Sequence, residues 1–198
     1  MEFKVSIIIY KDNKIISDKR HLTTKVSTLR TKADFSKIVK HEKTGIVFGF
    51  TGVTPTQLTI DSFSKLVSAA ICVDMLAANK KKKKKKLVKA TRIEERLGGI
   101  LQDFPTYFIA GIKDFVYIRD DNDSKQLTRI DPKDVQTTGS DAIEIRYLIE
   151  CGYTPKEAIR LGSEYSAFIS PESEEMKLVN FEETDLTVSS ILLNDKEE

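Results

Sequence analysis

Few side chains in this sequence are of the kinds that most enzymes use for acid–base chemistry. The only two histidines, His21 and His41, lie in polar stretches typical of loops. A Ser/His/Asp triad requires a histidine base, and histidine-rich metal sites require several imidazole ligands. We therefore expect both histidines to be solvated side chains, and the residue types favour neither a histidine-dependent hydrolase nor a histidine-rich metal centre.

The cysteines and the acidic run also lack the spacing of a metal site. Cys72 and Cys151 fall in segments with a helical pattern, where a buried free thiol is commoner than a disulfide or a metal ligand. The run Asp120–Asp123 lacks the glycine and the final glutamate of an EF-hand calcium loop. We expect a solvated turn at this run, and no cofactor.

Seven consecutive lysines form the strongest local charge in the sequence, between two segments with helical patterns. Like charges at positions i and i+4 destabilise a helix, so we expect an exposed and frayed joint. The simpler interpretation is a solvated connection, and the alternative is a polyanion-binding segment whose affinity falls steeply with salt. No aromatic residue interrupts the run, so base stacking is not indicated. The run consists of Lys80, Lys81, Lys82, Lys83, Lys84, Lys85 and Lys86.

Composition indicates a soluble globular chain with a single core. The 198 residues are 40% hydrophobic and 31% charged, and the formal net charge is only +2, so any basic function must be local. The longest nearly uncharged stretch, 65–78, contains Asp74, whereas a membrane-spanning helix needs about 20 apolar residues. Residues 1–5 lack the pattern of a secretory signal. We expect a structural N-terminus and a cytoplasmic location.

Hydrophobic periodicity and turn residues predict blocks of strands and helices in the order ββββ-αα-βββ-αα-β. Strands and helices in blocks favour an α+β fold with antiparallel sheets between helix layers. The strands are expected at 5–10, 14–17, 36–40, 45–50, 107–111, 115–119, 127–130 and 176–181, and the helices over 54–78, 87–101, 139–148 and from Thr154 onward, where Glu157 completes a capping box.

Several motifs, in this order, resemble the proteasome β subunit and HslV family of N-terminal-nucleophile hydrolases. The hairpin 8–20 resembles the opening of those subunits, and Lys37 and Gly49 have the family's separation of 12 residues. The elements 138–141 and 152–158 resemble the starts of the family's third and fourth helices, and 174–176 resembles the ending of HslV. The resemblance covers about 3–182 and implies a four-layer αββα sandwich. It implies a single domain over 1–183, with 184–198 as an acidic C-terminal extension.

The resemblance assigns catalytic positions to four residues. Lys37 corresponds to the lysine whose charge lowers neighbouring pKa values, and Asp18 corresponds to the carboxylate that holds this lysine. Gly49 corresponds to the donor of the oxyanion-hole N–H, and Ser140 to a supporting serine. Without the resemblance, the same residues would be interpreted as a surface ion pair, a turn glycine and a helix N-cap.

The sequence departs from the family at the nucleophile. Such enzymes use the hydroxyl and the free amine of an N-terminal threonine. Counting back from the turn at Lys11 and Asp12 places this position at Phe3, and one residue of slippage gives Glu2 or Lys4. None of these has a hydroxyl or a thiol. Cleavage before Thr23 or Thr24 would remove the first hairpin and Asp18.

Three functional interpretations follow. The first is a proteasome-like subunit that has lost its nucleophile and serves as a structural or regulatory component of a homo-oligomeric ring, of bacterial or phage origin. The second is an active threonine-type peptidase made by processing. The third is a binding module, for a protein or a polyanion, that uses the lysine run.

Overall fold

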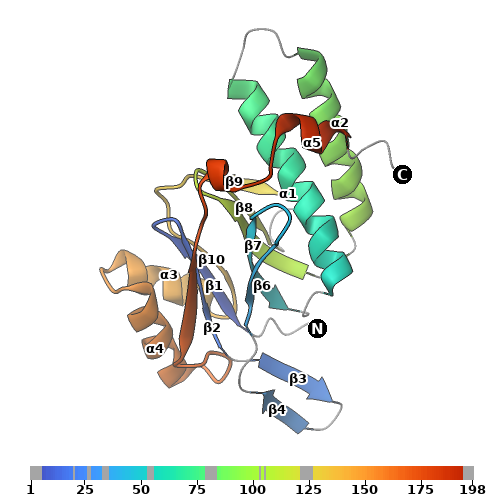
Figure 1. Cartoon of the computed structure of the whole chain (residues 1–198). Coiled ribbons are helices and arrows are strands. Elements are labelled where there is room, and N and C mark those ends of the chain that lie inside the picture. Colours follow the sequence, from blue (N-terminus) through green and yellow to red (C-terminus); the bar gives the residue numbers. More distant parts are fainter. Residues whose placement is uncertain are drawn as a thin grey trace.

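The structure is a computed structural model of the chain, and it describes residues 6–19, 21–25, 28–32, 36–52, 56–78, 84–102, 104, 106–120 and 127–193. Its strands form two larger antiparallel sheets and one separate hairpin (Figure 1). Within these residues, no helix is long and apolar enough to cross a membrane.

The first sheet has four strands in the order β10-β1-β2-β11. Its centre is the predicted hairpin, closed by Asp12 and Asn13 with φ of 51° and 57°, the positive values that a two-residue type I′ turn requires. The expected strand 176–181 is instead 173–177, and Phe181 begins a short 3-10 helix. The strands are β1 (Ile7–Lys11), β2 (Lys14–Asp18), β10 (Gln136–Gly139) and β11 (Ser173–Lys177).

The second sheet has five strands in chain order, β5-β6-β7-β8-β9. One of its faces packs on the first sheet, where Ile8 and Ile15 of the hairpin meet Val47 and Ile109 in one buried apolar cluster. The predicted strands are confirmed here within a few residues. They are β5 (Ile38–Lys40), β6 (Val47–Gly52), β7 (Thr106–Ile112), β8 (Phe115–Arg119) and β9 (Thr128–Ile130).

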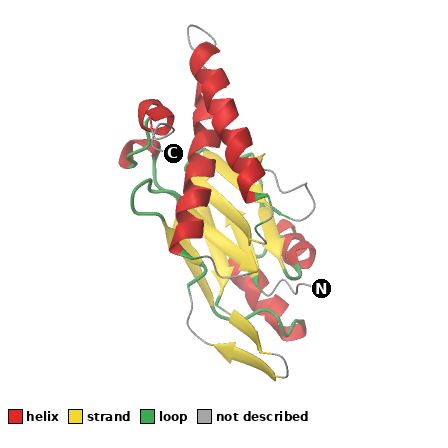
Figure 2. Cartoon of the chain, turned by 90° about the vertical axis from the view of Figure 1, so that its right-hand side faces the viewer, coloured by secondary structure: helices red, strands yellow, loops and turns green. Residues whose placement is uncertain are grey.

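Helices cover the outer face of each sheet (Figures 1 and 2). α1 (Gln57–Ala78) contributes Phe63 and Val67 to the core on the five-stranded sheet. It also pairs with α2 (Lys84–Leu101), which buries only its inner face, including Ala90. The expected helix start at Thr54 lies outside the described residues.

The opposite helix pair covers the four-stranded sheet. α3 (Ala142–Glu150) and α4 (Pro155–Tyr165) pack Ile145 and Ile159 against Ile7 and Ile9 of β1. The capping box predicted at the start of α4 is confirmed, because the Thr154 hydroxyl accepts from the Glu157 N–H and the Glu157 carboxylate accepts from the Thr154 N–H. α4 therefore begins where the sequence indicated, whereas the helix expected from Gly139 begins at Ala142, because Gly139 ends β10.

Three strands and one helix were not expected from the sequence. A two-stranded hairpin, β3 (His21–Lys25) and β4 (Thr28–Lys32), follows β2, and β10 was not foreseen. Residues expected to form only an extension contain α5 (Val188–Leu193), which contacts α1 and α2. Leu186 and Leu192 are buried there, so residues beyond 183 contribute to the core.

Candidate active site

The strongest polar feature of the interior is an ion pair between Asp18 and Lys37. The Lys37 Nζ lies 2.7 Å from the Asp18 Oδ1, and the two side chains are 5% and 0% exposed. The interpretation as a surface ion pair is therefore wrong. A buried charge is tolerated only when it is paired and hydrogen-bonded, and this pair meets that condition.

Backbone donors complete the environment of the Asp18 carboxylate. Oδ1 also accepts from the Ile7 N–H at 3.0 Å, and Oδ2 accepts from the Ser170 N–H at 3.0 Å. Asp18 is the last residue of β2, Ile7 the first of β1, and Ser170 lies between α4 and β11. One carboxylate thus joins three separate parts of the chain at the end of the four-stranded sheet.

Lys37 lies just before β5 in the other sheet, and Glu174 of β11 fixes its backbone. The Glu174 Oε1 accepts from the Lys37 N–H at 2.6 Å and from the Ser17 hydroxyl at 3.0 Å. The Lys37 carbonyl accepts from the Phe50 N–H at 3.0 Å. The lysine therefore reaches across the junction between the two sheets from a backbone that is held on both sides.

Gly49 lies within β6, opposite Ile38, the neighbour of Lys37. A Cβ at this position would be 2.6 Å from a methyl carbon of Ile15 and 2.7 Å from one of Ile8. These distances are far below van der Waals contact. The absence of a side chain allows the two sheets to approach each other, so Gly49 is a strand residue and not a turn glycine.

Ser140 lies beside the start of β1. Its N–H donates to the Ser6 carbonyl at 2.8 Å. Gly139 precedes it with φ of 113°, and a Cβ there would be 1.9 Å from the same oxygen. Ser140 is also not the N-cap of α3, because Asp141 occupies that position and accepts a hydrogen bond from the Ser166 hydroxyl.

All four assigned positions therefore converge on the sheet end where β1 begins. Asp18 binds Ile7, Ser140 binds Ser6, and Lys37 and its neighbour Ile38 pair with β6 at Phe50 and Gly49. The expected nucleophile position, Phe3, and its neighbours Glu2 and Lys4 lie outside the described residues. Ser6 is 1% exposed and is the first described residue of this end of the chain.

Chemically, this arrangement offers a fixed positive charge beside the start of β1. An ammonium group held by a buried carboxylate lowers the pKa of a nearby amine or hydroxyl by favouring its deprotonated form. Among the described residues, no group of three or more histidine, cysteine or carboxylate side chains is placed to hold a metal ion. The site is therefore suited to electrostatic activation of a residue at the start of β1.

Sequence reasoning missed two contributors to this site. Glu174 was recognised only as part of an ending motif, and Ser170 was not singled out. Both act through contacts with residues more than 130 positions away in the chain, which no local spacing reveals. In the sequence, the adjacent glutamates Glu174 and Glu175 were the only indication of these contacts.

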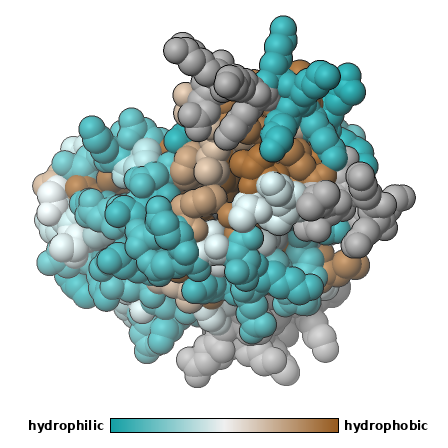
Figure 3. All heavy atoms as spheres, turned by 45° about the horizontal axis from the view of Figure 1, so that its top comes forward, coloured by the Kyte–Doolittle hydropathy of each residue, from teal (hydrophilic) through white to brown (hydrophobic). Residues whose placement is uncertain are grey.

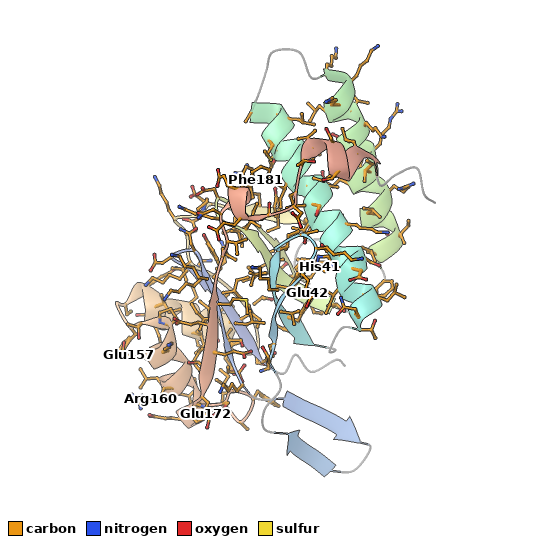
Figure 4. The ribbon with its side chains drawn as sticks, in the orientation of Figure 1. His41, Glu42, Glu157, Arg160, Glu172 and Phe181 are labelled. Atoms are coloured by element: carbon orange, nitrogen blue, oxygen red, sulfur yellow. The ribbon has the colours of Figure 1, made fainter. Side chains whose placement is uncertain are left out.

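The expectation that His41 is solvated is wrong. His41 is 7% exposed and lies at the base of α1 (Figure 4). Its Nδ1 lies 2.8 Å from the Thr44 hydroxyl and 3.0 Å from the Ser64 hydroxyl, and its Nε2 lies 3.2 Å from the Asp61 Oδ1. Ser64 is buried, so we interpret this cluster as a set of hydrogen bonds that joins the β5–β6 turn to α1. The side chain of His21 lies outside the described residues.

The cysteines and the lysine run differ in part from expectation. Cys72 is buried, as expected, but Cys151 is exposed, because it lies just beyond the C-terminal end of α3. Lys80–Lys83 lie outside the described residues. Lys84, Lys85 and Lys86 form the exposed first turn of α2.

Comparisons with known proteins identify the fold. No family model matches the sequence, and no curated protein matches it. Among solved structures, this chain is similar to eukaryotic HslV from Trypanosoma brucei, with a TM-score of 0.55 and 12% sequence identity, over 88% of this chain and 99% of that chain. At this identity the likeness shows the fold alone, and the chain therefore has an HslV-like, proteasome-like fold.

Proposed function

We propose that this chain is a proteasome-like subunit of the HslV type that has lost its N-terminal nucleophile and acts as a structural or regulatory component of a homo-oligomeric ring. The observation that carries the proposal is the contrast between a retained, buried Asp18–Lys37 pair and the residues at the expected nucleophile position. Phe3, Glu2 and Lys4 all lack a hydroxyl or thiol.

The scaffold supports this interpretation. The packing of α1 on one sheet and of α3 and α4 on the other supports a four-layer αββα sandwich, and the likeness to HslV extends over 88% of this chain. In this proposal Asp18, Lys37, Gly49 and Ser140 are vestigial catalytic positions that now stabilise the junction between the sheets. The assembly would be cytoplasmic.

A second candidate, an active N-terminal-nucleophile peptidase, is favoured by the position of Ser6. This serine immediately precedes Ile7, whose N–H binds Asp18. Cleavage before Ser6 would leave β1 complete and would create a free amine on a hydroxyl-bearing residue. Cleavage before Thr23, in contrast, would remove both strands of the hairpin.

Intact mass and peptide hydrolysis distinguish the two candidates. The purified protein and its Lys37→Ala variant are compared with a panel of fluorogenic peptides, and the mature N-terminus is read from the mass. The proposal expects Glu2 or Met1 at the N-terminus and no hydrolysis above that of Lys37→Ala. A mature chain beginning at Ser6, with hydrolysis that both Lys37→Ala and Ser6→Ala abolish, would favour the peptidase.

A further inference from the structure

The outward face of α2 carries a straight row of cationic side chains. Lys85, Lys89, Arg92 and Arg96 are spaced at i, i+4, i+7 and i+11, so they lie on one side of the helix. Together with Val88 and Ile93 they line a groove of about 430 Å³. Figure 3 views the molecule from this end and shows apolar surface beside protruding hydrophilic side chains.

Two of these four cations are not paired with a carboxylate of the described part of the chain. Lys85 and Arg92 have no carboxylate partner among the described residues, and the Lys89 Nζ donates to the Leu192 carbonyl at 2.6 Å. On α3 and α4, in contrast, exposed arginines are paired within their own helices, as Arg146 is with Glu150 and Arg160 is with Glu164. The α2 row is therefore a concentration of positive potential on a nearly neutral chain.

The same face also exposes apolar side chains. Val88 is 45% exposed and Ile100, one turn beyond Arg96, is 62% exposed. Gly99 directly precedes Ile100, and no atom lies within 4 Å of a Cβ added there, so the surface is open at this end of the row. A solvated lysine-rich helix gains nothing from such apolar exposure, whereas a docking surface combines both components.

We propose that this face of α2 binds an acidic amphipathic helix of a protein partner. A second helix has the same rise of about 5.4 Å per turn, so carboxylates on successive turns can align with the cationic row while leucine-like side chains contact Val88 and Ile100. A single-stranded nucleic acid fits this face less well, because the groove has no aromatic side chain for base stacking.

The proposal goes beyond the ring function and holds whether or not the chain is catalytic. It is tested with a labelled synthetic helical peptide that carries glutamates along one stripe and leucines beside them. The comparison ligands are the scrambled peptide and a single-stranded oligothymidylate, measured by fluorescence anisotropy at low and at physiological ionic strength. The protein variants are Lys85→Gln/Val88→Ser/Arg92→Gln and, as the matched control, Lys113→Gln/Lys133→Gln. Lys89 is retained because it binds the segment that contains α5.

The patterned peptide should bind more tightly than both comparison ligands, and the α2 variant should weaken this binding by roughly tenfold, while the control variant leaves it unchanged. Equal binding of the scrambled peptide, tighter binding of the oligothymidylate, or an unaffected α2 variant would each overturn the proposal. So would a severalfold gain in peptide affinity on removal of residues 194–198, because the acidic segment of the chain itself would then be the occupant.

Discussion

At the scale of single residues, Asp18 and Gly49 determine how the two sheets are joined. Asp18 binds a lysine from the other sheet and two backbone N–H groups. Gly49 allows the sheets to approach so closely that neighbouring isoleucine methyl groups fill the space of its absent side chain. The free energy of unfolding should therefore change when a single side chain at this junction is replaced.

Replacing Asp18 by asparagine should destabilise the protein by about 3–5 kcal/mol, because it leaves the Lys37 ammonium buried without its counter-charge. The matched control is Lys14→Gln, which breaks an exposed ion pair with Glu175 and should cost less than about 1 kcal/mol. Chemical denaturation measures both. The double variant Asp18→Asn/Lys37→Met should be more stable than Asp18→Asn alone, and an equal or greater loss would show that the pair is not the cause.

Gly49→Ala and Gly98→Ala should have opposite effects on the free energy of unfolding. At Gly49 the added methyl meets Ile15 and Ile8, and overpacking of this kind costs about 1–3 kcal/mol. At Gly98, inside α2, nothing lies within 4 Å, and alanine favours a helix over glycine by about 0.8–1 kcal/mol. Equal effects at the two positions would contradict the close approach of the sheets at β6.

At the scale of elements, α2 has two faces with different roles. Its outer face carries the cationic row, and its inner face packs on α1, where Glu94 lies near Asp74. Asp74 is held by the Tyr117 hydroxyl at 2.6 Å and by Arg129 at 3.1 Å. Burial, together with the charges of Asp74 and Glu95, raises the pKa of the Glu94 carboxyl above its usual value.

This environment makes the stability of the α1–α2 pair depend on pH. Because the pKa of Glu94 is higher in the folded state, the folded state holds its proton more strongly, and stability falls as the pH rises from 4.5 through the folded pKa. Glu94→Gln should therefore stabilise the protein at neutral pH and have little effect below about pH 4. Glu144→Gln, at an exposed position of α3, is the control in thermal denaturation at both pH values. Stabilisation by Glu94→Gln that persists below pH 4 would argue against this cause.

How far the sequence predicted these elements depends on whether their signals are local. The Asp12-Asn13 turn and the Thr154–Glu157 capping box are short-range signals, and both were correctly located. β10 was missed because its residues, Gln136–Gly139, form a strand only by pairing with β1. His41 was misjudged for a similar reason, because its polar neighbours in sequence gave no sign of Ser64, which lies 23 positions away.

At the scale of the whole molecule, the order of motifs predicted the α+β class and the relation to the HslV fold, and the structure bears out both at that level. The convergence of Asp18, Lys37, Gly49 and Ser140 followed from the resemblance and could not be derived from spacing alone. The roles of these residues, and the assembly of the chain into a ring, remain our proposals. Together, these proposals require that the protein keeps an unprocessed N-terminus and that it self-associates.

Native mass spectrometry of the purified protein tests both requirements most directly, because one spectrum gives both the mass of the subunit and the number of subunits. The account predicts a closed homo-oligomer whose subunits retain residues 2–5. A monomer at all concentrations would contradict the ring, and subunits that begin at Ser6 or at another hydroxyl-bearing residue would contradict the loss of the nucleophile.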